Sequence, residues 1–402
     1  MRVLQIGATY VGAQEKIEFA IHTYLESIGH ESYILYAYGT SNNARIIKYE
    51  SKWTNIIRRA LWKYIGKNPH CALLSTIQML RKIRKIHPDI VHLHMLHHGY
   101  TDYILLLKYL AKKKIPIIYT MHDMWAFTGG CYHYTDKQCS EYMENCMNCP
   151  KDTSELDCSV TKTSYYLNVK LNLFKNLKKV AFVAVSDWVH QEIMKSKLSC
   201  YQQYTVWNAL NADTYMELDE IKDTECLKEF NSNDKFKILG VAANWDTRKG
   251  IQRFFELANL LGEDYEIILA GNVSEQIKKT APTNIIFIGQ VIDKRMLAKC
   301  YEQADIHISM SLEETFGLTF VEAAYSGTRS IGFDSTAIAQ VVNKVKGFVI
   351  KENDVQEVAV KVRKLNQKRE LCKLSNAEMK EIFTEFSSKK MAEEYFRIYN
   401  SL

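Results

Sequence analysis

Two carboxylates in the C-terminal half of the chain, Glu314 and Glu322, stand eight positions apart with Gly317 between them. The segment follows a predicted strand, and Gly317 ends a loop that opens into a helix at Leu318. The first turn of a helix offers backbone N–H groups that bind anions, phosphate in particular. A carboxylate about one turn inside such a helix can accept hydrogen bonds from sugar hydroxyls. The segment therefore predicts a site for a sugar attached to a phosphate.

A second segment, residues 244–250, suits the same ligand. It follows another predicted strand, opens a helix, and places Arg248 directly beside Lys249. An arginine engages two phosphate oxygens at once, and a lysine supplies a point charge. Adjacent cations at a strand-to-helix turn therefore indicate a diphosphate site.

Histidines gather after two predicted strands of the N-terminal half. His92 and His94 alternate along one strand, so we expect them to point to a sheet face or into the core. His97 opens the following loop and could reach a cleft, and His122 and Asp123 follow the next strand. Taken alone, His122 is as well explained by a core histidine with satisfied hydrogen bonds as by a functional one.

Five of the ten cysteines crowd into residues 131–158. Cys146 and Cys149 have the two-residue gap of a zinc knuckle, and Cys131 and Cys139 could complete a four-cysteine site. The gaps of seven and six residues between the other members are unusual for zinc. The pattern leaves two interpretations open, a structural zinc site and free thiols in a loop.

Apolar strand candidates alternate with helical stretches along both halves of the 402-residue chain. Continuous apolar strands separated by helices are typical of parallel sheets covered on both faces. The sequence therefore predicts an α/β protein with two doubly wound, Rossmann-like domains facing across a cleft. We expect these domains at residues 1–205, with a Cys-rich insertion at 131–158, and at 206–386, and a C-terminal helix at 387–402 that returns to the first domain. The strand candidates are Arg2–Ile6, Asp89–His94, Ile115–Thr120, Val180–Val185, Phe236–Ala242, Glu266–Ala270, Ile285–Ile288, Asp305–Ser309 and Ser330–Phe333.

Charge is divided unevenly between the two halves. Residues 1–205 hold 26 Lys and Arg against 16 Asp and Glu, whereas residues 206–402 hold 26 against 30. At 47% hydrophobic and 24% charged residues, the chain has the composition of a packed protein rather than a disordered one. A basic half and a mildly acidic half suggest that the halves meet different partners.

The segment 48–67 combines basic and aromatic residues at helical spacing. This pattern suits a helix lying on an anionic membrane surface, and the alternative is a helix packed on its domain with a solvated basic face. Nucleic acid is disfavoured as a partner because no recognition motif accompanies the charge. With neither an export signal nor a membrane span in the sequence, we expect a cytoplasmic protein, peripheral on the inner face of the membrane. The residues are Trp53, Ile56, Ile57, Leu61, Trp62, Tyr64 and Ile65 among Lys52, Arg58, Arg59, Lys63 and Lys67.

Together these segments resemble the retaining glycosyltransferases of family 4, which have the GT-B fold. The family's E-x7-E motif matches Glu314 and Glu322, and its Lys-Gly turn matches Lys249 and Gly250. The family usually has an arginine five positions before the lysine, and here that position is Asn244. Arg248 then stands in for its phosphate contact.

The N-terminal half resembles a polysaccharide-biosynthesis branch of that family. The resemblance rests on the His94 segment and on the run from His122 to Cys131, which reads His-Asp-Met-Trp-Ala-Phe-Thr-Gly-Gly-Cys and leads into the Cys-rich loop. It implies that His122 lies near the transferred sugar and the attacking hydroxyl, with Gly12, His94 and Asp123 on the acceptor side.

In the C-terminal half the resemblance implies the donor contacts. Lys249 and Arg248 hold the diphosphate, Glu322 the ribose, and Glu314 hydroxyls of the donor sugar. The amides of Gly317, Leu318 and Thr319 cap the phosphate, and Phe316 is a further donor-binding residue. Catalysis is then assigned to His122, Glu314 and Lys249, and it needs no cofactor, because fixed cations stabilise the departing nucleotide diphosphate.

The implied function is transfer of a sugar from a nucleotide-sugar to a lipid-linked oligosaccharide in bacterial surface polysaccharide biosynthesis, with retention of configuration. Two alternatives are a sugar-nucleotide epimerase of the same fold and a non-catalytic, zinc-bearing partner subunit. The epimerase would act without an acceptor, and the partner subunit would not bind a nucleotide-sugar.

Overall fold

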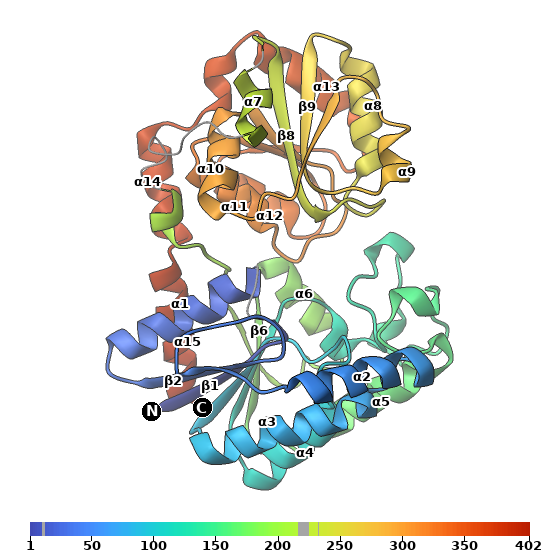
Figure 1. Ribbon diagram of the computed structural model, residues 1–402, viewed down its shortest axis with the longest axis vertical. Coiled ribbons are helices and arrows are strands. Elements are labelled where there is room, and N and C mark those ends of the chain that lie inside the picture. The colour runs from blue at the N-terminus through green and yellow to red at the C-terminus, as the bar shows by residue number, and fades with distance from the viewer. Residues whose placement is uncertain (10–12, 216–224, 232) are drawn as a thin grey trace. The chain divides into compact units, whose positions relative to one another are not determined.

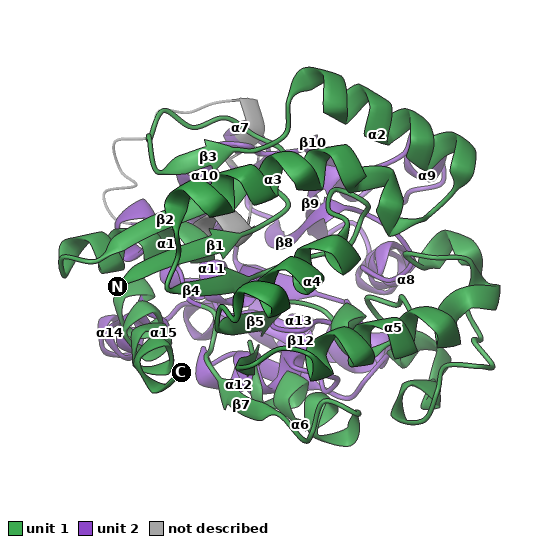
Figure 2. Cartoon of the chain, turned by 90° about the horizontal axis from the view of Figure 1, so that it is seen from below, with its two compact units in different colours: residues 1–208, 388–402 green, residues 209–387 purple. Residues whose placement is uncertain are grey.

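The computed structural model describes residues 1–9, 13–215, 225–231 and 233–402. The chain divides into two compact units, shown in green and purple in Figure 2. Unit 1 comprises residues 1–208 and 388–402, and unit 2 comprises residues 209–387. Each unit is built on one parallel sheet, so the expected α/β fold with two Rossmann-like domains is confirmed.

Unit 1 has a seven-stranded sheet in the order β3-β2-β1-β4-β5-β6-β7, with every neighbouring pair parallel. The strand order reverses between β1 and β4, and helix α3 contacts α4, as Figure 1 also shows. The strands are β1 (Arg2–Ile6), β2 (Glu31–Tyr36), β3 (Ile46–Lys48), β4 (Ile90–Leu93), β5 (Ile117–Met121), β6 (Val180–Ala184) and β7 (Gln202–Thr205). The helices are α1 (Ala13–Ser27), α2 (Lys52–Ile65), α3 (Leu73–Ile86), α4 (Tyr103–Lys113), α5 (Thr163–Lys175), α6 (Asp187–Lys195) and α15 (Ser388–Ser401).

Unit 2 has a six-stranded parallel sheet in the order β10-β9-β8-β11-β12-β13, which reverses between β8 and β11. Its strands are β8 (Phe236–Asn244), β9 (Tyr265–Asn272), β10 (Ile285–Gly289), β11 (Ile306–Ser309), β12 (Ser330–Phe333) and β13 (Phe348–Ile350). Its helices are α7 (Glu225–Asn231), α8 (Ile251–Leu261), α9 (Glu275–Lys278), α10 (Lys294–Gln303), α11 (Leu318–Tyr325), α12 (Ile338–Lys344), α13 (Val355–Asn366) and α14 (Asn376–Glu385).

Four strands, β2, β3, β7 and β13, lie outside the candidates expected from the sequence. The strands β3 and β13 have only three residues each, and β7 is polar and only partly covered. All three end their sheets, where one side of a strand has no partner strand and long apolar runs are not required.

The last helix, α15, belongs to unit 1 although the chain reaches it only after completing unit 2. It packs along α1 (Figure 1). Its residues Tyr395 and Tyr399 are buried. The Tyr395 hydroxyl lies 3.0 Å from Thr120 Oγ1, and the Tyr399 hydroxyl lies 2.7 Å from His92 Nδ1. The packing of α15 therefore completes the face of the sheet that holds these two residues.

Candidate functional site

The expected donor residues lie where the strand order of unit 2 reverses. Lys249 follows β8 and Glu314 follows β11, and these two strands are neighbours in the sheet. In doubly wound sheets, ligands bind beyond the carboxyl ends of the strands at this switch point. The fold therefore brings together two residues that stand 65 positions apart.

The turn that carries Lys249 is fixed by its own sequence. The Lys249 N–H donates to Asp246 Oδ1 over 2.7 Å, which closes the turn with a side chain. Gly250 has φ +82°, and a Cβ there would lie 2.4 Å from the Met310 carbonyl oxygen. Only glycine allows the turn to approach the end of β11 this closely, so Gly250 sets where the lysine stands.

Lys249 and Glu314 form an ion pair in which Lys249 Nζ donates to Glu314 Oε1. Their side chains are 23% and 18% exposed, so the pair is reachable from solvent. Burial alone would raise the pKa of Glu314, but the Lys249 ammonium and the Arg248 guanidinium more than offset it and hold that pKa below its usual value. The site thus offers cationic donors and an ionised acceptor side by side.

The loop before α11 holds Glu314 in place and starts the helix. The Glu314 N–H donates to Thr336 Oγ1 over 3.1 Å, and the Ala337 N–H donates to the Glu314 carbonyl over 3.3 Å. Gly317 has φ +88° and caps α11, and Phe316 is buried beside it. The first N–H groups of α11, at Leu318 and Thr319, have no acceptor within the helix and suit an anion.

Glu322 lies in the second turn of α11 and is only 6% exposed. The Tyr301 hydroxyl donates to Glu322 Oε2 over 3.2 Å, and burial together with this carboxylate raises the pKa of Tyr301 well above its usual value. The carboxylate is therefore held in one orientation by a buried tyrosine of α10. Asn244, five positions before Lys249, ends β8, and its Oδ1 accepts a hydrogen bond from Asn272.

In unit 1 the expected histidines meet beyond the carboxyl ends of two neighbouring strands, β4 and β5. His94 follows β4 and His122 follows β5, and His94 Nδ1 lies 3.1 Å from His122 Nε2. His94 Nε2 lies 3.1 Å from Gln5 Oε1 of β1. Burial lowers the pKa of His122 to about 4, so its ring is neutral at pH 7. Gly12, expected on the acceptor side, lies outside the described residues.

The Asp123 carboxylate forms a hydrogen bond with His97, which the sequence predicted only to lie in a loop that could reach a cleft. His97 Nε2 lies 2.6 Å from Asp123 Oδ2, and the Trp125 N–H donates to Asp123 Oδ1 over 2.9 Å. Although burial opposes ionisation, these contacts lower the pKa of Asp123 to about 2. A charged carboxylate therefore sits beside the neutral imidazole of His122.

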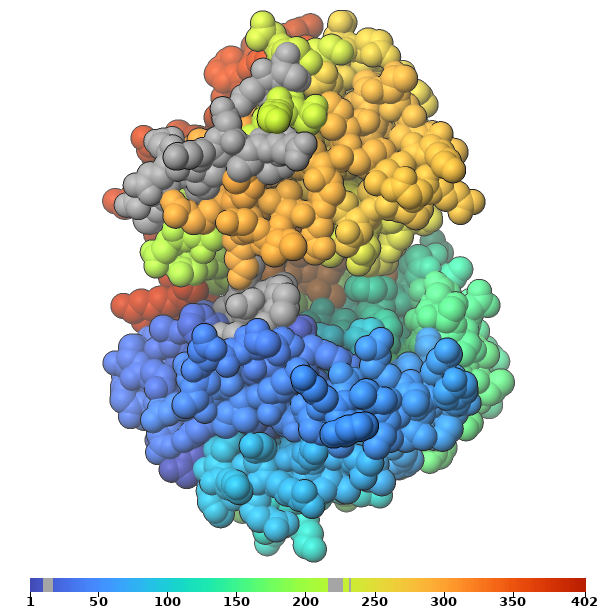
Figure 3. Space-filling model, in the orientation of Figure 1, coloured from blue at the N-terminus to red at the C-terminus, as the bar shows by residue number. Residues whose placement is uncertain are grey.

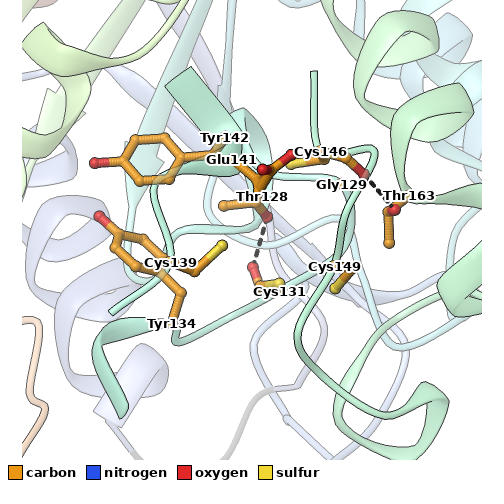
Figure 4. A pocket seen from close by; sticks show the side chains of 10 residues that line it. All are labelled: Thr128, Gly129, Cys131, Tyr134, Cys139, Glu141, Tyr142, Cys146, Cys149 and Thr163. Carbon is orange, nitrogen blue, oxygen red and sulfur yellow. Dashed lines mark hydrogen bonds between the residues drawn. The ribbon is translucent and has the colours of Figure 1, made fainter. Parts of the chain in front are cut away.

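The structure brings together the four cysteines whose spacing allowed a zinc site. Cys131, Cys139, Cys146 and Cys149 surround one small pocket, as Figure 4 shows, and all four are free thiols. Within the described ranges, no three His, Cys, Asp or Glu side chains are placed to hold a metal ion. Burial raises the pKa of the Cys146 thiol to about 11.

Helix α2 turns an apolar stripe towards solvent rather than into the core. Trp53, Ile56 and Tyr64 are 76%, 60% and 79% exposed, and the helix lies on the face seen in Figure 3. One of its expected surface cations is instead internal. Arg58 is 4% exposed and its Nε donates to Glu50 Oε1 over 2.7 Å. Of the helices that the structure describes, none is long and apolar enough to cross a membrane.

Three residues of these sites were not anticipated. Gln5 is a polar side chain inside the apolar strand β1, which is the signal that could have identified it. Thr336 and Tyr301 carry no such signal, because they come from a neighbouring loop and helix and meet their partners only in the folded unit.

Two families of known glycosyltransferases match the chain. Residues 19–199 match Glycosyltransferase Family 4, and residues 223–381 match Glycosyl transferases group 1. A putative colanic acid biosynthesis glycosyl transferase of Escherichia coli, WcaC, is 21% identical over the full length of both chains. An uncharacterized protein in the cps region of Klebsiella pneumoniae is 22% identical over 88% of this chain and 90% of its own.

Solved structures share the fold over the whole chain. Sucrose-phosphate synthase from Thermosynechococcus elongatus superposes with a TM-score of 0.71 at 14% identity, covering 100% of this chain and 98% of its own. HepE from Anabaena in complex with UDP and glucose superposes with a TM-score of 0.66 at 13% identity, covering 100% of both chains. The fold and the family matches make this protein a glycosyltransferase of the GT-B fold. Unit 1 carries its Glycosyltransferase Family 4 domain, and unit 2 carries its Glycosyl transferases group 1 domain.

Proposed function

We propose that this glycosyltransferase moves a sugar from a nucleotide-diphosphate-sugar to a lipid-linked oligosaccharide during bacterial surface polysaccharide biosynthesis, with retention of configuration. The observation that carries the donor half of the proposal is the Lys249–Glu314 pair at the switch point of unit 2. The similarity to WcaC and to the protein of the Klebsiella cps region supports the polysaccharide role.

On the donor side, Lys249 and Arg248 bind the diphosphate, and the N–H groups at the start of α11, from Gly317 to Thr319, cap a phosphate. Glu314 accepts hydrogen bonds from the donor sugar. Glu322, oriented by Tyr301, accepts them from the ribose. Negative charge grows on the nucleotide as the sugar leaves, and fixed cations in a partly buried site stabilise that charge.

On the acceptor side, His122 lies at the reacting hydroxyl, and His94, Asp123 and Gly12 shape its surroundings. The lipid carrier explains why the protein would work at a membrane. The exposed apolar stripe of α2, flanked by Lys52, Arg59 and Lys63, suits the anionic inner face of the cytoplasmic membrane. The protein then acts from the cytoplasm as a peripheral enzyme.

The donor assignment is tested with Lys249→Ala and Glu314→Ala, each assayed for nucleoside diphosphate release against a panel of nucleotide-sugars. We expect each variant to lose transfer by about 100-fold or more, because each removes a charge that contacts the donor. Lys278→Ala, which removes an exposed lysine from α9 of the same unit, serves as the matched control and keeps full activity. Full activity in both site variants would refute the assignment.

The same panel separates the alternatives. An epimerase converts the donor to a second nucleotide-sugar when no acceptor is present, which product analysis detects. A non-catalytic partner subunit gives no heat of binding with any nucleotide-sugar in calorimetry. Either result would overturn the proposed transfer.

A further inference from the structure

Three side chains from adjacent strands of unit 1 form a hydrogen-bonded chain that ends at His122. Gln5 lies in β1, His94 follows β4 and His122 follows β5, and these strands are consecutive in the sheet. Gln5 Oε1 lies 3.1 Å from His94 Nε2, and His94 Nδ1 lies 3.1 Å from His122 Nε2. Each contact needs one donor and one acceptor, so the identity of the first group dictates the rest.

The amide of Gln5 can have only one orientation. Its Nε2 donates to the Glu18 carbonyl oxygen over 2.9 Å in a fully buried position. Turning the amide over would set two acceptor oxygens against each other and leave both without a donor. The Gln5 carbonyl therefore faces His94, and it can only accept. His94 Nε2 must carry the hydrogen.

The same reasoning continues through the two imidazoles. His94 is 1% exposed, and burial first of all lowers its pKa well below the usual value, so the ring is neutral. With its hydrogen on Nε2, His94 Nδ1 is an acceptor, and the hydrogen in the second contact must come from His122 Nε2. His122 is neutral as well, which makes its Nδ1 the hydrogen-bond acceptor of the ring.

Two further buried side chains, Glu18 and His92, lie around Gln5 and His94. The Glu18 carboxyl lies buried against Gly7, where a Cβ would be 2.1 Å from Glu18 Oε1. Burial raises the pKa of Glu18 well above its usual value, which disfavours a negative charge on its carboxyl. The ring centroid of His92 lies 4.0 Å from that of His94, and His92 is held by hydrogen-bond contacts with Tyr399 and Thr120.

We infer that Gln5 is a positioning residue that acts through His94 to fix His122 in the tautomer whose Nδ1 accepts a hydrogen bond. This inference rests on the proposed function, in which His122 meets a reacting sugar hydroxyl. In this tautomer His122 Nδ1 carries no hydrogen, so it can accept a hydrogen bond from a substrate hydroxyl. Gln5, which selects this tautomer, is separated from His122 by two hydrogen bonds and does not touch substrate.

The tautomer is measured directly by long-range ¹H–¹⁵N NMR on histidine-labelled protein, with the His122 and His94 signals assigned from His122→Gln and His94→Gln variants. We expect both rings of the unaltered protein to be neutral at pH 7 with the hydrogen on Nε2. A hydrogen on His122 Nδ1, or a charged ring, would overturn the inference without any variant being needed.

Two substitutions of Gln5 give the matched comparison. Gln5→Met removes the acceptor, so His94 and His122 should show a mixture of tautomers, and kcat should fall about tenfold or more with donor KM within about twofold. Gln5→Glu keeps the pattern, because a buried, protonated carboxyl accepts from His94 and donates to the Glu18 carbonyl as the amide does. We expect it to retain the NMR signature and most of kcat.

Two outcomes keep this inference separate from the proposed function. If Gln5→Met, folded by circular dichroism, keeps both the single tautomer and full kcat, the positioning role is wrong. If the tautomers are as inferred but no nucleotide-sugar is turned over, the proposed function fails while the geometry of the hydrogen-bonded chain stands.

Discussion

At the scale of single residues, the proposed donor site depends on the backbone conformation of a glycine. Gly250 combines φ +82° with a close approach to the Met310 carbonyl, and Lys249 precedes it directly. Any other residue at position 250 would have to adopt a backbone conformation that L-residues avoid, and its Cβ would collide with the Met310 carbonyl oxygen. The position of the lysine is therefore encoded in its neighbour.

Gly250→Ala should lower the free energy of unfolding by about 2–4 kcal/mol, since the turn must move as well as adopt a strained φ. Gly262, at the other end of α8, provides the control: its φ is +78°, but nothing lies within 4 Å of an added Cβ. Gly262→Ala should cost only about 1 kcal/mol. Urea unfolding measures both, and equal losses would show that the approach to Met310 imposes no constraint.

At the scale of elements, α2 carries both a buried cation and exposed cations. Arg58 faces inward and pairs with Glu50, whereas Lys52, Arg59 and Lys63 face solvent beside the apolar stripe. Removing one partner of a buried ion pair costs about 3–5 kcal/mol. Arg58 must therefore be left intact in any test of membrane binding, or loss of folding would be mistaken for loss of affinity.

The membrane surface is tested by sedimentation with vesicles of phosphatidylcholine, with and without phosphatidylglycerol. Arg59→Glu with Lys63→Glu should weaken binding to the anionic vesicles by roughly 30-fold or more, at about 1 kcal/mol for each cation removed and more for reversal. Lys112→Glu with Lys113→Glu, the same change of charge on α4, should bind as the unaltered protein does. Equal binding by both double variants would refute α2 as the docking element.

The sequence could predict that Lys249 and Glu314 meet, because each follows a strand candidate and parallel strands end at one edge of a sheet. It could not predict the Tyr301–Glu322 hydrogen bond or the inward turn of Arg58. Both depend on how a helix is rotated about its axis, and α2 has basic residues on more than one side. The link from Gln5 to His94 spans 89 positions and arises only from strand order.

At the scale of the whole molecule, both units bury histidines in their neutral form. In unit 2, His307 is fully buried and burial lowers its pKa to about 3, and in unit 1 burial lowers the pKa of His92 well below its usual value. Such groups must take up a proton on unfolding below about pH 6.5. Their contribution to stability is complete above that pH and is lost as the pH falls towards the folded-state pKa.

Between pH 7 and pH 5, the unaltered protein should lose about 2 kcal/mol more of its unfolding free energy than His307→Gln does. Glu18, whose pKa is raised by burial, acts in the opposite direction, but it does so equally in both proteins. Urea unfolding at the two pH values makes the comparison. Above pH 7 the difference between the proteins should be constant, and identical pH dependence throughout would contradict the assignment.

The placement of α15 in unit 1 has a consequence for the order of folding during synthesis. The residues of unit 2 form one continuous stretch, 209–387, so that unit can close as soon as the stretch leaves the ribosome. Most of unit 1 is synthesised first. The contacts of Thr120 with Tyr395 and of His92 with Tyr399 form only later, because each pair is more than 270 positions apart. The half of the protein that is made first is thus completed last, and until then the part of its sheet that α15 covers is exposed and open to chaperone binding.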